Sequence, residues 1–146
     1  MESIIPLMVV VLVLLAIFEL SFGFYHCFFE AGKRYGVDPY LLVAIAKVES
    51  NFVPTAIHHN GNGSTDYGIM QINSYWLKRY KIPIQWIMEP CYNIHMGAMV
   101  LKRCIISYGY TPKAIDCYNK GSPRGDYSHY VIKVYQSYAR VKALVE

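Results

Sequence analysis

Glu49 places a carboxyl group within the apolar face of a predicted helix. Leu42, Ile45 and Phe52 recur around it at helical spacing. At about 100° per residue, Glu49 lies about 40° from Ile45 and about 20° from Leu42 around the helix axis. Because apolar surroundings disfavour the charged form, we expect the pKa of Glu49 to be raised. Such a carboxyl can act as the general acid in glycoside cleavage. The alternative is a glutamate at the edge of the core, held by a neighbouring amide or tyrosine.

A second carboxylate, Asp66, follows 17 residues later, within a segment of strand-like and turn-like composition at residues 63–74. Beside a general acid, a second carboxylate can stabilise an oxocarbenium-like transition state or act as a nucleophile. The alternative is a turn aspartate that accepts hydrogen bonds from local backbone N–H groups. Both interpretations stay open from the residues alone.

Several polar side chains near these carboxylates could bind a sugar or orient the acid. The amide of Gln71 can bond a hydroxyl or acetamido group, and the phenol of Tyr118 can hydrogen-bond the carboxyl of Glu49 and fix its orientation. The full set of substrate-binding or orienting candidates is Ser50, Gln71, Asn73, Tyr118 and Asn119.

The elements that must position these groups are mainly helical. Asp38 followed by Pro39 is typical of a helix start, with an N-cap acceptor before a proline at the first helical position. We expect one small β-hairpin within residues 65–72. Helices are predicted near residues 27–35, 38–51, 74–80, 91–108 and 111–118, with a last one capped by Asp126. The fold class is therefore a helical globule with a small β-hairpin beside the site.

The chain has 146 residues, which suits one domain. Its first part, residues 4–18, is apolar but shorter than the roughly 20 residues that span a bilayer. Small residues at Ser21 and Gly23 suit a signal peptidase, so we predict an export signal at residues 1–23 and a mature domain at 24–146. Because this segment begins with Glu2 and carries no Lys or Arg, an uncleaved membrane anchor is the alternative.

The net charge of the chain indicates which kind of polymer it could bind. The chain carries a net charge of +4; loss of residues 1–23 removes two glutamates and no basic residue, which gives +6. A basic exported domain suits an anionic polymer such as a cell wall. The basic residues are scattered without a stripe or a reader motif, so no nucleic-acid partner is expected.

Four cysteines remain in the mature domain, and an even number in a small exported domain suggests disulfides, with three possible connectivities. We favour the connectivity in which the second pair joins two adjacent helices across a short turn. Metal binding is disfavoured because no CxxC or HxxxH spacing is present. The favoured pairs are Cys27–Cys91 and Cys104–Cys117.

Three motifs together resemble those of the goose-lysozyme-like soluble lytic transglycosylases. Glu49-Ser50 matches their Glu-Ser, residues 68–71 match Gly-Leu-Met-Gln, and residues 117–119 match Ala-Tyr-Asn. Ile69 replaces the leucine, and Cys117 replaces the alanine. The resemblance extends over residues 27–138, and the chain is also similar to small exported members that accompany type III secretion systems.

This resemblance implies a lysozyme-like, mainly α fold of the α+β type and cleavage of the β-1,4 bond between N-acetylmuramic acid and N-acetylglucosamine, without a cofactor or metal. It assigns the catalytic acid and base to Glu49, and substrate or orienting contacts to the other matched residues, Gln71, Asn73, Tyr118 and Asn119. The implied partners are peptidoglycan strands and a secretion apparatus, and the implied location is the periplasm.

Two rival functions remain open. Residues 63–74 also resemble the strand of c-type lysozymes around their second carboxylate, which would favour a muramidase hydrolase that uses Glu49 and Asp66. The other rival is a non-catalytic peptidoglycan-binding assembly module.

Overall fold

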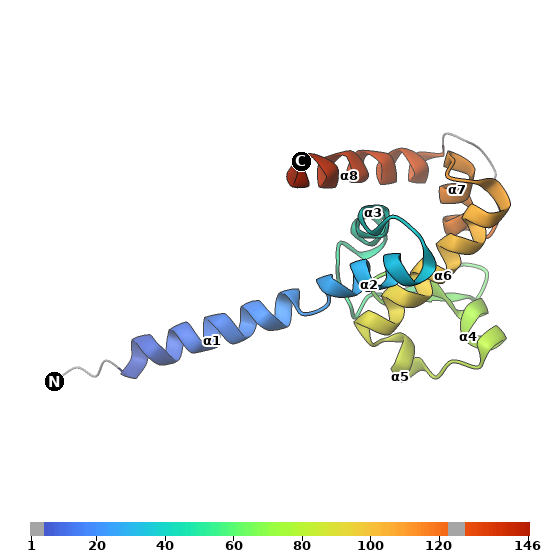
Figure 1. The fold of residues 1–146 in the computed structure, drawn as a ribbon. Coiled ribbons are helices and arrows are strands. Elements are labelled where there is room, and N and C mark those ends of the chain that lie inside the picture. Colours follow the sequence, from blue (N-terminus) through green and yellow to red (C-terminus); the bar gives the residue numbers. More distant parts are fainter. Residues whose placement is uncertain (1–4, 123–127) are drawn as a thin grey trace.

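The computed structural model describes residues 5–122 and 128–146, which form eight helices and three short strands (Figure 1). The helical fold with a small β element that the sequence predicts is confirmed. The helices are α1 (Ile5–Phe22), α2 (Tyr25–Tyr35), α3 (Pro39–Ser50), α4 (Ser74–Tyr80), α5 (Ile84–Ile87), α6 (Pro90–Tyr108), α7 (Pro112–Lys120) and α8 (His129–Val145). The strands are β1 (Ile57–His59), β2 (Thr65–Tyr67) and β3 (Ile72–Asn73).

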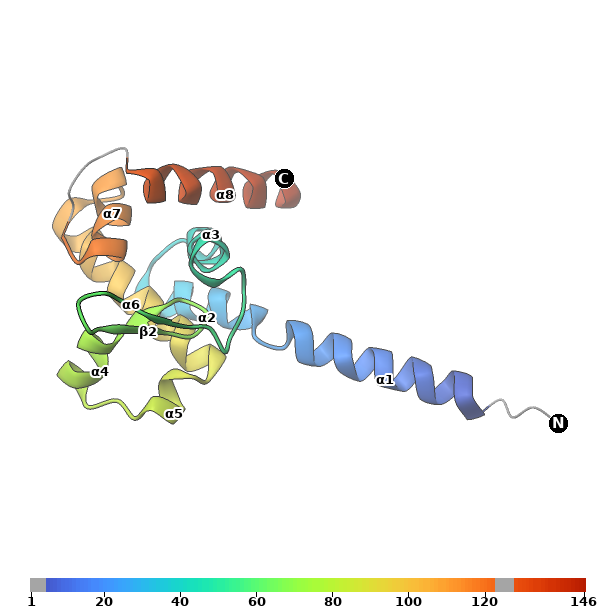
Figure 2. The same ribbon diagram turned by 180° about the vertical axis from the view of Figure 1, so that it is seen from behind.

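Helix α1 projects away from the rest of the fold, as Figures 1 and 2 show from opposite sides. Its side chains from Leu7 to Leu15 are apolar and exposed. Within the described ranges, no helix combines the length and the apolar character needed to cross a membrane. The assignment of residues 1–23 to an export signal stays a prediction.

Helix α3 begins as its sequence predicts. The carboxylate of Asp38 accepts a hydrogen bond from the backbone N–H of Tyr40 at 2.8 Å, and Pro39 occupies the first turn. The second carboxylate oxygen of Asp38 accepts from the hydroxyl of Tyr138 at 2.6 Å. This contact ties α8 to the start of α3, and the two helices lie against each other (Figure 1).

The core lies between α3, α6 and α8. Leu42 and Ile45 of α3, Leu101 of α6 and Val134 of α8 are all fully buried. Because Glu49 shares the helix face of Leu42 and Ile45, packing of this face fixes the backbone that carries the carboxyl group.

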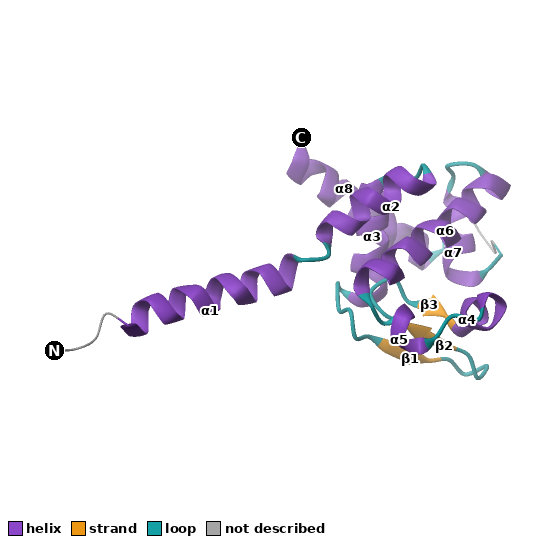
Figure 3. Cartoon of the chain, turned by 60° about the horizontal axis from the view of Figure 1, so that its bottom comes forward, coloured by secondary structure: helices purple, strands orange, loops and turns teal. Residues whose placement is uncertain are grey.

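The strands form an antiparallel sheet in the order β1-β2-β3, beside α4 (Figure 3). The sheet has one strand more than the predicted hairpin. Asp66 is central: it pairs with His58 of β1 and with Asn73 of β3. Asn73 also caps α4, because its side chain accepts from the backbone N–H of Tyr75 at 2.9 Å.

Helix α8 begins later than predicted. Ser128 caps it by accepting from the backbone N–H of Val131 at 3.3 Å, whereas the predicted cap, Asp126, lies outside the described residues. Helix α8 therefore starts at His129, and Tyr130 lies in its first turn.

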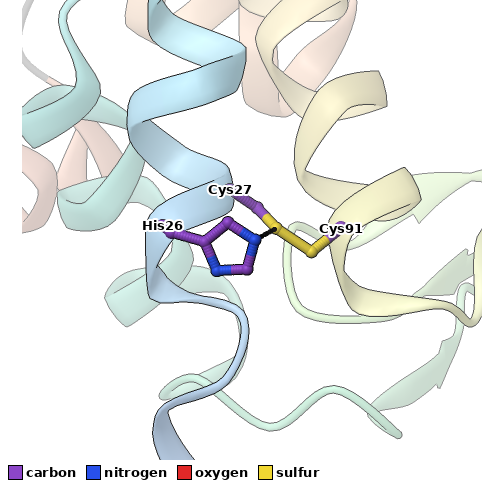
Figure 4. Close-up of side chains that lie close together, drawn as sticks. All are labelled: His26, Cys27 and Cys91. Carbon is purple, nitrogen blue, oxygen red and sulfur yellow. Dashed lines mark hydrogen bonds between the residues drawn. A yellow bond between two sulfur atoms is a disulfide. The ribbon is translucent and has the colours of Figure 1, made fainter.

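Two disulfides tie the helices with the connectivity that the sequence favoured. Cys27–Cys91 joins α2 to α6, and Cys104–Cys117 joins α6 to α7. Figure 4 shows His26 beside the first bond, with its Nε2 atom 3.4 Å from Sγ of Cys27. The imidazole and the two sulfurs lie within 4.8 Å of one another, but sulfurs bonded to each other are not thiolate ligands for a metal.

Candidate active site

A groove of about 1290 Å³ runs between the sheet, α4, α6, α7 and the end of α3. It brings together most of the residues that the sequence singled out as catalytic or substrate-binding. Glu49 comes from the last turn of α3, and Asp66 comes from β2. The predicted residues that line the groove are Glu49, Asp66, Gln71, Asn73, Tyr118 and Asn119.

Ser50 is the exception among the predicted residues. Its hydroxyl donates to the backbone oxygen of Ile69 at 2.8 Å and accepts from the N–H of Val53 at 3.2 Å. Ser50 therefore ties the end of α3 to the turn before β3, and it does not line the groove. These contacts give Ser50 a structural role, and its role as a substrate-binding residue stays a prediction.

The carboxyl group of Glu49 is poised to hold a proton near neutral pH. Burial raises its pKa from 4.5 to about 7, and the negative charge of Asp66 adds to the rise. A hydrogen bond from the hydroxyl of Tyr130, at 2.6 Å from Oε1, opposes the rise because it stabilises the carboxylate. The group can therefore give up a proton and take one back at the same pH, as a combined acid and base requires.

Tyr130, and not Tyr118, holds the carboxyl group of Glu49. The hydroxyl of Tyr118 donates instead to the backbone oxygen of Met70 at 2.9 Å. Burial raises the pKa of both phenols well above the ordinary value, so both remain hydrogen-bond donors. The predicted orienting role of Tyr118 is therefore corrected, although Tyr118 still lines the groove.

Asp66 is held by two side-chain amides. Its Oδ2 accepts from Asn60 at 2.8 Å, and its Oδ1 accepts from Asn73 at 2.7 Å. Hydrogen bonds to a charged carboxylate are among the stronger ones, so both oxygens are fixed in place. Asn73 thus orients the second carboxylate, and Asn60 is a groove residue that the sequence analysis missed.

The amide nitrogen of Gln71 is bound by backbone oxygens. Its Nε2 donates to the backbone oxygens of Gly68 at 2.9 Å and of Ala56 at 3.2 Å. Both amide protons are thus engaged, and its Oε1 accepts no hydrogen bond from any other described residue. Because Gln71 lines the groove, this oxygen is available to a hydroxyl or N–H of a substrate.

A buried asparagine holds the turn that supports the site. Asn93 of α6 is fully buried; its oxygen accepts from the N–H of Met70, and its nitrogen donates to the oxygens of Tyr67 and Ile87, all at 2.8 Å. Gly68 has a φ of +77°, and a Cβ there would lie 2.3 Å from the Asn93 amide nitrogen. The turn therefore needs both residues. An amide within the apolar stripe of α6 is the signal that could have revealed Asn93.

Tyr130→Phe should shift the alkaline limb of the pH–activity profile to higher pH. The lost hydrogen bond lowers the pKa of Glu49 in the wild type, so its removal raises that pKa and keeps the acid protonated to higher pH. The maximum rate should fall about tenfold because the carboxyl loses its fixed orientation. Tyr118→Phe is the matched control: it should leave the limb where it is, because its hydroxyl bonds Met70. An unshifted limb for Tyr130→Phe would contradict the assignment.

The groove, the protonated acid and the fixed second carboxylate define a carbohydrate-cleaving type of site, and comparison with known proteins agrees. The family model of the transglycosylase SLT domain matches residues 26–131. Invasion protein IagB of Salmonella typhimurium strain SL1344 is 39% identical over 125 residues, which cover 81% of this chain and 78% of IagB. Protein IpgF of Shigella flexneri is 38% identical over 124 residues, which cover 80% and 82%.

A solved structure has the same fold. The X-ray structure of an inactive mutant of lytic transglycosylase Slt from Pseudomonas aeruginosa superposes with a TM-score of 0.58 at 22% identity. The match covers 82% of this chain and 22% of that chain. The chain belongs to the transglycosylase SLT domain family, and it is an enzyme of the peptidoglycan lytic transglycosylase type.

Proposed function

We propose that this enzyme cleaves the β-1,4 bond between N-acetylmuramic acid and N-acetylglucosamine and closes a 1,6-anhydro ring on the muramic acid. The observation that carries the proposal is the half-buried carboxyl of Glu49 in the groove, bonded by Tyr130 and with a pKa raised to about 7. A transglycosylase needs one group that acts first as an acid and then as a base, and this carboxyl meets that need.

The reaction uses the same carboxyl twice. Protonated Glu49 gives its proton to the glycosidic oxygen as the bond from that oxygen to C1 breaks. The resulting carboxylate takes the proton of the muramic acid 6-hydroxyl, and the 6-oxygen forms the new bond to C1. Glu49 ends protonated again, and no water is consumed. The negative charge of Asp66 stabilises the positive charge that develops on the sugar.

The product separates this proposal from hydrolysis. We expect mass spectrometry of muropeptides released from purified sacculi to show anhydro ends, each lighter by one water than the ends that a muramidase leaves. Asp66→Asn should slow release about ten- to a hundredfold without a change of product, because it removes one charge near the reacting sugar. Hydrated ends would establish the hydrolase instead. An unaffected rate for Asp66→Asn would assign Asp66 to a structural role in the sheet.

A non-catalytic binding module is the second rival. Such a module would bind sacculi without releasing soluble product. A pure binder has no use for a carboxyl that burial keeps protonated, which favours catalysis.

The proposed setting is the periplasm, where the enzyme opens the cell wall locally for a secretion apparatus. Support comes from the predicted export signal, the basic mature chain, the resemblance to small transglycosylases that accompany type III secretion systems, and a relative that is described as an invasion protein. Cell fractionation tests the location: recovery of the mature chain in the cytoplasm would contradict it.

A further inference from the structure

One wall of the groove carries a cation, Arg103, that pairs with none of the described carboxylates. The face of α6 that contains Val100, Arg103, Cys104 and Ser107 lines the groove, and Arg103 is exposed there. Lys120, which also lines the groove, lies 2.9 Å from Asp116 in an ion pair. Among the side chains that the structure describes (residues 7–16, 23–122 and 128–146), no carboxylate lies within ion-pair distance of Arg103.

The guanidinium of Arg103 rests on the aromatic ring of Trp76 in α4. Its Cζ lies 5.4 Å from the ring centroid of Trp76. Trp76 is itself fixed, because it stacks on Tyr80 at 5.9 Å with an interplanar angle of 6° and meets Tyr75 edge-on at 5.0 Å. A guanidinium over an aromatic face keeps its N–H groups free along its edge, where they can meet a carboxylate in a bidentate pair.

The groove is lined by ionisable groups of both signs. Glu49 and Asp66 come from α3 and β2, whereas Arg103 comes from α6 and rests on α4. An anionic group of a bound substrate is repelled by the carboxylate of Asp66 and attracted by Arg103. This charge arrangement therefore sets which part of the substrate lies along the α4–α6 wall.

We propose that Arg103 binds a carboxylate of the peptide stem that the glycan strand carries, and that it makes the enzyme prefer peptide-bearing strands. The inference rests on the proposed function. The sugar rings bring hydroxyl and acetamido groups, whereas an uncross-linked peptide stem brings free carboxylates. A fixed guanidinium recognises a carboxylate with more specificity than a mobile ammonium group does.

The test compares intact glycan strands with strands from which an amidase has removed the peptide stems. Wild-type enzyme should prefer intact strands, and Arg103→Gln should lower the ratio of kcat/KM between intact and stripped strands about tenfold, mainly through KM. Arg103→Lys should fall between the two, because it keeps the charge and loses the bidentate geometry. The preference of the wild type should also shrink at high salt.

Arg140→Gln is the matched control. Arg140 is exposed on α8 and does not line the groove, so its loss should leave the ratio unchanged. An unchanged ratio for Arg103→Gln would overturn the inference. An equal loss on both substrates would do so as well, since stripped strands keep the lactyl carboxylate of muramic acid. Failure of the wild type to cut either substrate would instead defeat the proposed function.

Discussion

Glu49→Gln should abolish the digestion of purified sacculi while the protein stays folded. The amide cannot give a proton to the glycosidic oxygen, and a general acid contributes about 10²- to 10⁴-fold to the rate. Its oxygen can still accept the hydrogen bond from Tyr130, so the geometry of the site is kept. The measurement is the release of soluble muropeptides together with the loss of turbidity. Glu30→Gln, at an exposed position on α2, is the control and should digest normally. Retained digestion by Glu49→Gln would end the assignment.

The same variant should be more stable than the wild type at alkaline pH. Because folding raises the pKa of Glu49 from 4.5 to about 7, the folded state binds more protons than the unfolded state between these values. The free energy of unfolding of the wild type therefore falls as pH rises through this window. Above pH 7, the charged Glu49 lowers the free energy of unfolding of the wild type by about 3 kcal/mol, and the uncharged glutamine does not have this effect. Urea unfolding at pH 4 and pH 8 measures the difference, which should vanish at pH 4.

Asn93→Ala should cause a large loss of stability. The substitution leaves the N–H of Met70 and the backbone oxygens of Tyr67 and Ile87 without their partner in a buried site. An unsatisfied buried group costs about 1–3 kcal/mol, so we expect the free energy of unfolding to fall by about 3–6 kcal/mol. Urea unfolding measures it.

Asn119 provides a matched control, because it is an asparagine that is exposed rather than buried. Asn119→Ala, at an exposed position, should change the unfolding free energy by less than about 0.5 kcal/mol. A loss below about 1 kcal/mol for Asn93→Ala would show that the turn before β3 does not depend on this amide. Activity should fall with stability, because the same turn contacts Tyr118 and Ser50.

The part of the site that depends on one helix could be predicted from the sequence. Asp38 and Pro39 mark the start of α3, and helical spacing then places Glu49 among Leu42 and Ile45. Both the apolar surroundings of the carboxyl and the direction of its pKa shift follow from this local pattern. Local periodicity is a reliable guide where a residue and its neighbours share one element.

Contacts between distant elements could not be predicted in the same way. The hydroxyl that holds Glu49 comes from Tyr130, 81 residues away, and its position depends on how α8 crosses α3. The periodicity of α8 indicates which face is buried, but not which side chain of that face meets the carboxyl. Tyr118 belongs to the segment that resembles the Ala-Tyr-Asn motif, which predicts that its hydroxyl holds Glu49. In the structure that hydroxyl donates to the backbone oxygen of Met70 instead.

The disulfide between Cys104 and Cys117 has a consequence for where the enzyme is stable. Both cysteines line the groove, and the bond joins α6, which carries Arg103, to α7, which carries Tyr118. The two cross-links contribute about 3 and about 4 kcal/mol, a large share of the 5–15 kcal/mol that stabilises a typical domain. A newly made chain among reduced thiols lacks both ties. The groove wall would therefore gain its full stability only where thiols can oxidise, as in the periplasm proposed above, and reducing surroundings would keep it less stable.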